Sequence, residues 1–81
     1  MPSKQVSASE MFKVLKELGF RESARRGDHL LLQHPQAGVI LSLPTGERYI
    51  RLVVIRAIER SLENHKLVSR DDFRRRLGIL L

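Results

Sequence analysis

Hydrophobic residues recur at helical spacing near the start of the chain, directly after a sequence typical of a helix cap. Ser7 and Glu10 have the spacing of a capping box, in which each side chain binds a backbone amide of the first turn. The apolar residues that follow lie three and four apart, and Gly19 stands where helices often end in a left-handed residue. The pattern predicts a first helix over about residues 8–18.

The middle of the chain contains short apolar runs divided by residues that favour turns. Gly27-Asp28 precedes the run 29–34, and the sequence Pro-Gln-Ala-Gly at 35–38 follows it. After that turn, residues 39–43 alternate between two sets of positions, as the two faces of a strand require. We interpret these two runs as a hairpin and residues 20–26 as a third, edge strand.

A long helix is predicted from Tyr49 to about Asn64. Its apolar stripe has the spacing i, i+3, i+4, i+7, i+8 and i+12, and consists of Ile50, Val53, Val54, Ala57, Ile58 and Leu62. Leu52 and Ile55 lie outside this stripe and form a second apolar strip. Another part of the chain must therefore cover this helix on a second side.

A short final helix could supply that cover. Ser69 and Asp72 repeat the capping spacing, and Phe73 and Leu77 then share one helical face. The order is α-β-β-β-α with an additional C-terminal helix, which predicts an α+β fold. We expect a small three-stranded antiparallel sheet with helices on one face, and a single domain over residues 1–81.

Composition and charge narrow the classes of function. The chain carries 15 Lys and Arg against 9 Asp and Glu, a formal net charge of +6, which favours polyanions or acidic proteins as partners. It has no cysteine, so disulfides, thiolate zinc sites and cysteine nucleophiles are excluded. No apolar stretch has the length of a signal peptide core or a membrane span, so we expect a soluble cytoplasmic protein without a membrane partner.

Among the three histidines, His29 has the most suggestive surroundings. It follows a basic turn that contains Gly27 and begins a strand rich in leucine, whereas His34 precedes a proline in a turn and His65 ends a helix. We expect His34 and His65 to be polar surface or turn residues. His29 and His34 are five apart and would lie on opposite faces of a strand, so we expect no metal site. The glycines form no phosphate-binding loop, so we expect no nucleotide cofactor.

The arginines fall into two further groups. We interpret Arg70, Arg74, Arg75 and Arg76 as a solvated face or a partner contact, because cations are favoured near the end of a short helix. The second group follows the long helix and consists of Arg48, Arg51, Arg56 and Arg60. Those at its start would lie near free backbone amides that can bind phosphate, so nucleic-acid contact is expected there.

The chain resembles the HicA family of toxins, also called YcfA-like mRNA interferases. In that family a helix ending in Leu-x-x-x-Gly-aromatic precedes a Gly-Ser-His signature at the start of a strand that often ends in His-Pro. Residues 15–20 match the first feature, Gly27 and His29 match the second, and His34-Pro35 matches the third. The similarity extends from about Ser9 to Leu77.

This resemblance implies a fold like that of double-stranded-RNA-binding domains and a metal-independent endoribonuclease activity. His29 would act as general base or acid while the RNA 2′-hydroxyl attacks the adjacent phosphate. The candidate RNA-binding residues are Arg25, Arg26, Gly27, Arg48 and Arg51. The expected partners are mRNA and a HicB-like antitoxin protein that covers the histidine and stops cleavage.

Two other classes of function stay open. One is a non-catalytic RNA-binding module with the same fold, which is favoured by Asp28 at the position of the family serine. The other is a protein-interaction module, in which Leu52, Ile55 and the arginine-rich last helix would bind a protein and RNA would not enter.

Overall fold

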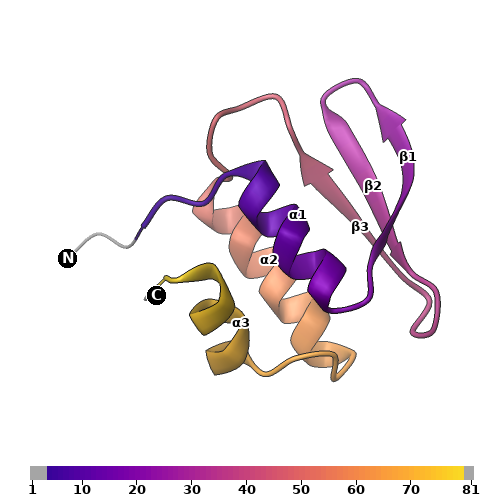
Figure 1. The fold of residues 1–81 in the computed structure, drawn as a ribbon, viewed down its shortest axis with the longest axis vertical. Coiled ribbons are helices and arrows are strands. Elements are labelled where there is room, and N and C mark those ends of the chain that lie inside the picture. Colours follow the sequence, from indigo (N-terminus) through magenta and orange to yellow (C-terminus); the bar gives the residue numbers. More distant parts are fainter. Residues whose placement is uncertain (1–3, 80–81) are drawn as a thin grey trace.

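A computed structural model describes residues 4–79 of the chain. Its elements follow the predicted order (Figure 1), and they are α1 (Ala8–Glu17), β1 (Arg21–Arg26), β2 (His29–His34), β3 (Val39–Pro44), α2 (Leu52–Asn64) and α3 (Arg70–Leu77). The fold is α+β, with a three-stranded antiparallel sheet in the order β1-β2-β3. The predicted fold class is confirmed.

The capping box at the start of α1 forms as predicted. The Ser7 hydroxyl accepts a hydrogen bond from the Glu10 backbone N–H, and the Glu10 carboxylate accepts one from the Ser7 backbone N–H, both at 3.1 Å. The helix ends before Gly19, whose φ of +104° is costly for any residue with a Cβ. Met11, Val14 and Leu15 of this helix are buried in the core.

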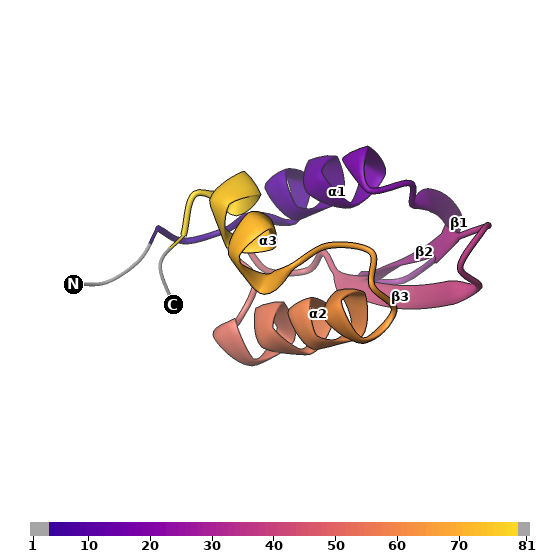
Figure 2. The ribbon, with the colours of Figure 1, turned by 90° about the horizontal axis from the view of Figure 1, so that it is seen from below.

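Only one face of the sheet is covered by helices. Alternate residues of β2 and β3 are buried, and these are Leu30, Leu32, His34, Val39, Leu41 and Leu43. The residues between them are exposed or half-buried. Figure 2 shows α1 and α2 on the same side of the strands, so the other side of the sheet faces solvent.

Strand β1 contains an irregularity that changes which of its residues share a face. Its register against β2 is regular from Arg26 back to Ala24, but then shifts between Ala24 and Glu22, so Ser23 is an extra residue in a β-bulge. Beyond the bulge, Arg21 lies opposite Gln33, and cross-strand neighbours lie on the same face. No sequence pattern predicted this bulge.

The predicted inward stripe of α2 is wrong in its phase. The helix begins at Leu52 rather than Tyr49, and its buried residues are Ile55, Ile58, Glu59 and Leu62. Val53, which was predicted to be inside, is 70% exposed, and Ala57 is exposed too. Ile50 does reach the core, but as a residue of the preceding loop, where its backbone N–H donates to the Val6 carbonyl at 2.8 Å.

Helix α3 closes the core on the side away from the sheet. It lies against both α1 and α2 (Figure 2), and it buries Phe73 and Leu77 completely or nearly so. The Ser69 hydroxyl caps it by accepting from the Asp72 backbone N–H at 3.2 Å, and Gly78 ends it in the left-handed conformation. This helix does pack against α2, but Leu52 of the second apolar strip stays 47% exposed, so the predicted cover is present only in part. Within residues 4–79, no helix is long and apolar enough to cross a membrane.

Candidate nucleic-acid interface

His29 is exposed at one end of the sheet, on the face that the helices leave open. It is the first residue of β2, and its cross-strand neighbours are Arg26 on β1 and Pro44 on β3. A two-residue turn joins β1 to β2, and Gly27 adopts a φ of +55° there, with no atom near the position that a Cβ would occupy. The predicted pairing of His29 with a basic, glycine-containing turn is therefore present in the fold.

Asp28 connects this turn to the loop that follows β3. Its carbonyl oxygen accepts hydrogen bonds from the Thr45 backbone N–H at 2.6 Å and from the Thr45 hydroxyl at 2.9 Å. Its carboxylate lies against Gly46, where an added Cβ would come within 2.8 Å of Asp28 Oδ2. Asp28 thus fixes the end of the sheet, and no hydrogen bond between it and His29 occurs in the described part of the chain.

The two arginines before Gly27 lie on opposite faces of the sheet. Arg26 pairs with His29 on the open face, whereas Arg25 pairs with Leu30, whose side chain is in the core. Both arginines are exposed because β1 is an edge strand, and neither forms an ion pair with any residue between 4 and 79. Of this predicted pair, only Arg26 shares a surface with His29.

Arg48 and Arg51 lie in the segment between β3 and α2. That segment leaves β3 at the end of the sheet where the Gly27 turn lies (Figure 1). The Arg48 guanidinium is 6.0 Å from the centre of the Tyr49 ring, and Arg51 forms an ion pair with Glu47 at 3.2 Å. Both arginines are exposed, but no contact connects either of them to His29.

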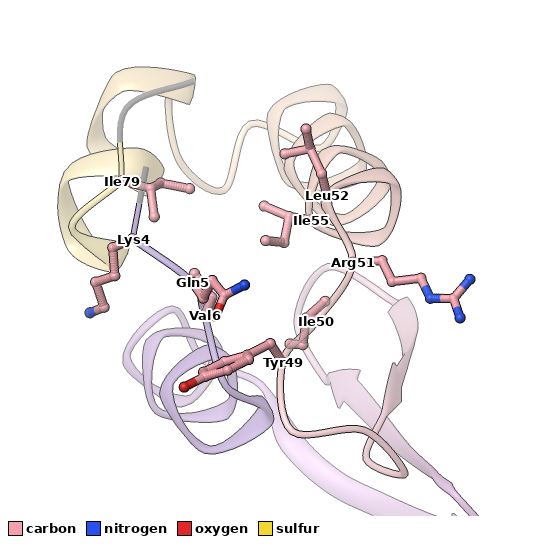
Figure 3. A pocket seen from close by; sticks show the side chains of 9 residues that line it. All are labelled: Lys4, Gln5, Val6, Tyr49, Ile50, Arg51, Leu52, Ile55 and Ile79. Atoms are coloured by element: carbon pink, nitrogen blue, oxygen red, sulfur yellow. The ribbon is translucent and has the colours of Figure 1, made fainter. Parts of the chain in front are cut away.

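A hollow of about 350 Å³ opens at the start of α2, and its lining is mostly apolar (Figure 3). Val6, Ile50 and Ile55 line its inner wall, while the Arg51 side chain is directed away from it. Arg51 is the N-cap of α2 but gives the helix no side-chain hydrogen bond. At the start of α2, the Arg51 side chain and the free backbone amides of the first turn therefore do not point toward a common position where a phosphate could bind.

The arginines of α3 bind acidic residues of the other helices instead of forming a free basic patch. Arg74 makes two hydrogen bonds to the buried carboxylate of Glu59, at 2.7 and 3.0 Å. These bonds raise the pKa of Arg74 above its ordinary value, because the carboxylate stabilises the charged guanidinium. Arg76 contacts Asp72 at 3.0 Å and Glu17 at 3.3 Å. Much of the basic surface predicted on α3 is thus neutralised within the molecule.

His34 is a core residue, which corrects its predicted place on the surface. Its ring is 6% exposed and meets Phe20 edge to face, with ring centres 5.2 Å apart. The Ala37 backbone N–H donates to Nδ1 at 3.0 Å, so the proton of the neutral ring is on Nε2 and is donated to the Leu18 carbonyl at 3.0 Å. His65 is exposed at the end of α2, as predicted.

The open face holds further polar residues that the sequence interpretation did not include. We use "open face" for the exposed side of the sheet, which is defined by Arg21, Ala24, Arg26, His29, Leu31, Gln33, Ile40, Ser42 and Pro44. None of these side chains is acidic. The alternation within β2 and β3 could have identified Gln33, Ile40 and Ser42 from the position of His29, but Arg21 reaches this face only through the bulge at Ser23.

The described residues were also searched for groups of metal ligands, and the chain was compared with known proteins. Among residues 4–79, no three His, Cys, Asp or Glu side chains come together as metal ligands would. No protein-family model matches the chain, and no curated protein matches it.

Proposed function

We propose that the protein is a metal-independent endoribonuclease similar to the HicA toxins, with His29 as its catalytic residue. The observation that carries the proposal is an exposed histidine directly opposite Arg26, on a sheet face that has no carboxylate. An imidazole can exchange protons near neutral pH, and a guanidinium stabilises charge on a phosphate. The formal net charge of +6 also favours a polyanionic substrate.

In the proposed reaction, the RNA supplies its own nucleophile. His29 removes the proton from a 2′-hydroxyl, the 2′-oxygen bonds to the adjacent phosphorus, and the bond from phosphorus to the 5′-oxygen breaks. The products are a 2′,3′-cyclic phosphate and a 5′-hydroxyl, whose proton comes from water or from the histidinium. Arg26 would offset the negative charge that develops on the pentavalent phosphorus centre. Gly27, which has no side chain, leaves the approach to this end of the sheet open.

The proposed setting is a type II toxin-antitoxin system. The substrate would be mRNA in the cytoplasm, and a HicB-like protein would bind the toxin and cover His29. Arg25, Arg48 and Arg51 are exposed at the same end of the molecule and would hold phosphates outside the reacting position.

Substitution of His29 tests the catalytic role. His29→Ala should lower the rate of cleavage of a labelled single-stranded RNA by about 10²- to 10⁴-fold, the usual contribution of a general acid or base. The matched control is His65→Ala, because His65 is exposed at a helix end far along the chain and should leave cleavage unchanged. EDTA should leave the rate of the wild type unchanged. Equal rates for His29→Ala and the wild type would exclude His29 as the catalytic group.

A non-catalytic RNA-binding module is the second candidate. A specific observation favours it: no hydrogen bond within residues 4–79 orients the His29 ring, and the Asp28 carboxylate lies at Gly46 instead. Catalytic histidines are usually oriented by a second group. RNA binding by the wild type without cleavage, and with no change in His29→Ala, would support this module. Binding of a protein but not of RNA would support the protein-interaction module.

A further inference from the structure

We infer that the open face is the track of the substrate, along which one RNA strand runs from the Arg26–His29 end of the sheet to the Arg21–Gln33 end. This inference rests on the proposed function and adds a binding site to it. In β2 the two ends are separated by four residues, from His29 to Gln33, or about 13 Å at 3.3 Å per residue. The reacting phosphate would lie at one end, and a second contact would lie at the other.

The bulge at Ser23 determines the charge of this track. Arg21 and Arg26 are an odd number of residues apart, so a regular strand would place them on opposite faces. The extra residue brings both arginines onto the open face and places Glu22 on the other side, opposite Leu32. Without the bulge, the same sequence would put a carboxylate where the RNA has to pass.

The middle of the track and its Arg21 end offer the contacts that an unpaired strand requires. Gln33 and Ser42 are exposed donors and acceptors that can bind base edges or the 2′-hydroxyl. Ile40, which is 63% exposed, and the half-buried Leu31 supply apolar surface for the faces of bases. In the sheet register Leu31 and Ser42 lie between the two arginines, whereas Gln33 and Ile40 lie beside Arg21 at the end of the track.

A hollow continues the positive surface at the Arg21 end. It has a volume of about 370 Å³, and it is lined by Lys16, Gly19, Phe20, Arg21, His34, Pro35 and Gln36. Its lining includes two cations and no acidic residue. Lys16 contacts the Phe12 ring at 5.3 Å, and neither Lys16 nor Arg21 forms an ion pair within the described chain. A phosphate leaving the sheet at this end would therefore meet one further positive charge, that of Lys16, beside Arg21.

The dimensions and the charge of the open face favour a single RNA strand over the other possible occupants. A module that binds duplex RNA spans about 16 base pairs, several times the length of this face. A second copy of the chain would bring another basic face without carboxylates against this one, which is unfavourable. An unpaired strand carries the complementary charge and exposes its bases to the apolar residues Leu31 and Ile40 of the track.

The experiment measures the affinity for oligouridine of about 2 nucleotides, which is too short to reach from Arg26 to Arg21, and of about 16 nucleotides, the upper end of the site sizes in single-strand-binding folds. All binding variants carry His29→Ala, so that the RNA stays intact. Arg21→Gln should weaken binding of the longer RNA about fivefold to tenfold and reduce its salt slope by about 0.7, the value for one phosphate contact on a single strand. It should affect the shorter RNA less.

Two further variants complete the test. Arg56→Gln removes the same charge from the outer side of α2, where Arg56 is exposed and has no ion pair among residues 4–79, and it should leave both affinities unchanged. Ser42→Glu puts a carboxylate in the middle of the track and should weaken binding of both RNAs. Circular dichroism spectra identical to that of the wild type would show that these variants fold.

The results separate this inference from the proposed function. Length-dependent binding that is lost in Arg21→Gln, without cleavage by the wild type, would support the track and contradict the ribonuclease. Equal effects of Arg21→Gln and Arg56→Gln would overturn the track, and cleavage that depends on His29 would still stand. A wild-type dimer that Ser42→Glu converts to a monomer, with unchanged RNA affinity, would also overturn the track, because a second copy would then occupy the open face.

Discussion

His34 and His29 lie on the same strand, but their side chains have different energetic roles. The His34 ring fills a space against Gly19, where an added Cβ would come within 2.7 Å of Nε2, and it satisfies two backbone groups. The His29 ring is exposed and has no hydrogen-bond partner in the described chain. The first histidine therefore stabilises the fold, and the second is available for function.

Substitution of each histidine should separate stability from activity. His34→Ala should lower the free energy of unfolding by about 2–4 kcal/mol, because it leaves the Leu18 carbonyl and the Ala37 N–H unsatisfied and opens a cavity beside Phe20. His29→Ala should lower it by about 1 kcal/mol or less, as exposed substitutions usually do. Urea unfolding measures both. A loss of stability in His29→Ala equal to that in His34→Ala would contradict this assignment.

The sequence could not predict the burial of His34, because this burial depends on residues that lie elsewhere in the chain. Leu18, Gly19 and Phe20 come from the end of α1 and the start of β1, and they meet the ring only when the sheet packs on the helix. The local signal, a histidine before a proline, is typical of a turn. The opposite orientation of His29 could be predicted, because it depends only on the alternation of one strand.

At the scale of the elements, α2 gives the clearest case of what a periodic pattern misses. The expected stripe counted only apolar residues and therefore included Val53 and Ala57, whereas the buried face contains Glu59. Glu59 can be buried because Arg74 of α3, fifteen residues later in the chain, donates two hydrogen bonds to its carboxylate. The strands and both serine caps were predictable because their signals are local.

The ion pair between α2 and α3 should matter more than its neighbours on the surface. Arg74→Ala should lower the midpoint of thermal unfolding, because the buried Glu59 carboxylate would lose both of its hydrogen bonds and, among residues 4–79, keep only the more distant Arg70, at 4.0 Å. Arg75→Ala is the matched control, since the Arg75 side chain is 77% exposed and lies 3.9 Å from Asp72. It should leave the midpoint almost unchanged. Equal midpoints for the two variants would mean that the buried pair does not hold α3 in place.

The capping box of α1 should make the stability of the protein depend on acid pH. The hydrogen bond from Lys4 and the backbone hydrogen bond from Ser7 hold the pKa of Glu10 below its ordinary value. The stabilisation from Glu10 is therefore complete above the ordinary glutamate pKa and is lost as the pH falls through the lowered one. Glu10→Gln should be less stable than the wild type near neutral pH. The difference should shrink on acidification in urea unfolding, and a difference that grows would contradict this role.

At the scale of the whole molecule, the arginines of α3 take up a large share of the acidic side chains. Each of four carboxylates contacts an arginine of α3, and these are Glu17, Glu59, Glu63 and Asp72. On the open face, by contrast, the cations have no acidic neighbour on the same face. The formal net charge of +6 is thus distributed unevenly. The positive charge of the α3 arginines is partly neutralised, whereas that of the sheet arginines is not. This distribution depends on tertiary contacts, so the arginines of α3 and those of the sheet could not be distinguished by sequence alone.

The bulge in β1 also affects how the protein behaves in concentrated solution. An edge strand presents unpaired N–H and C=O groups, and another molecule can use them to extend the sheet. In β1 the extra residue Ser23 interrupts that ladder, and the strand carries four charged side chains among its six residues. Both features discourage the addition of a foreign strand. The same extra residue that moves Arg21 to the open face therefore also protects the β1 edge of the sheet from edge-to-edge aggregation.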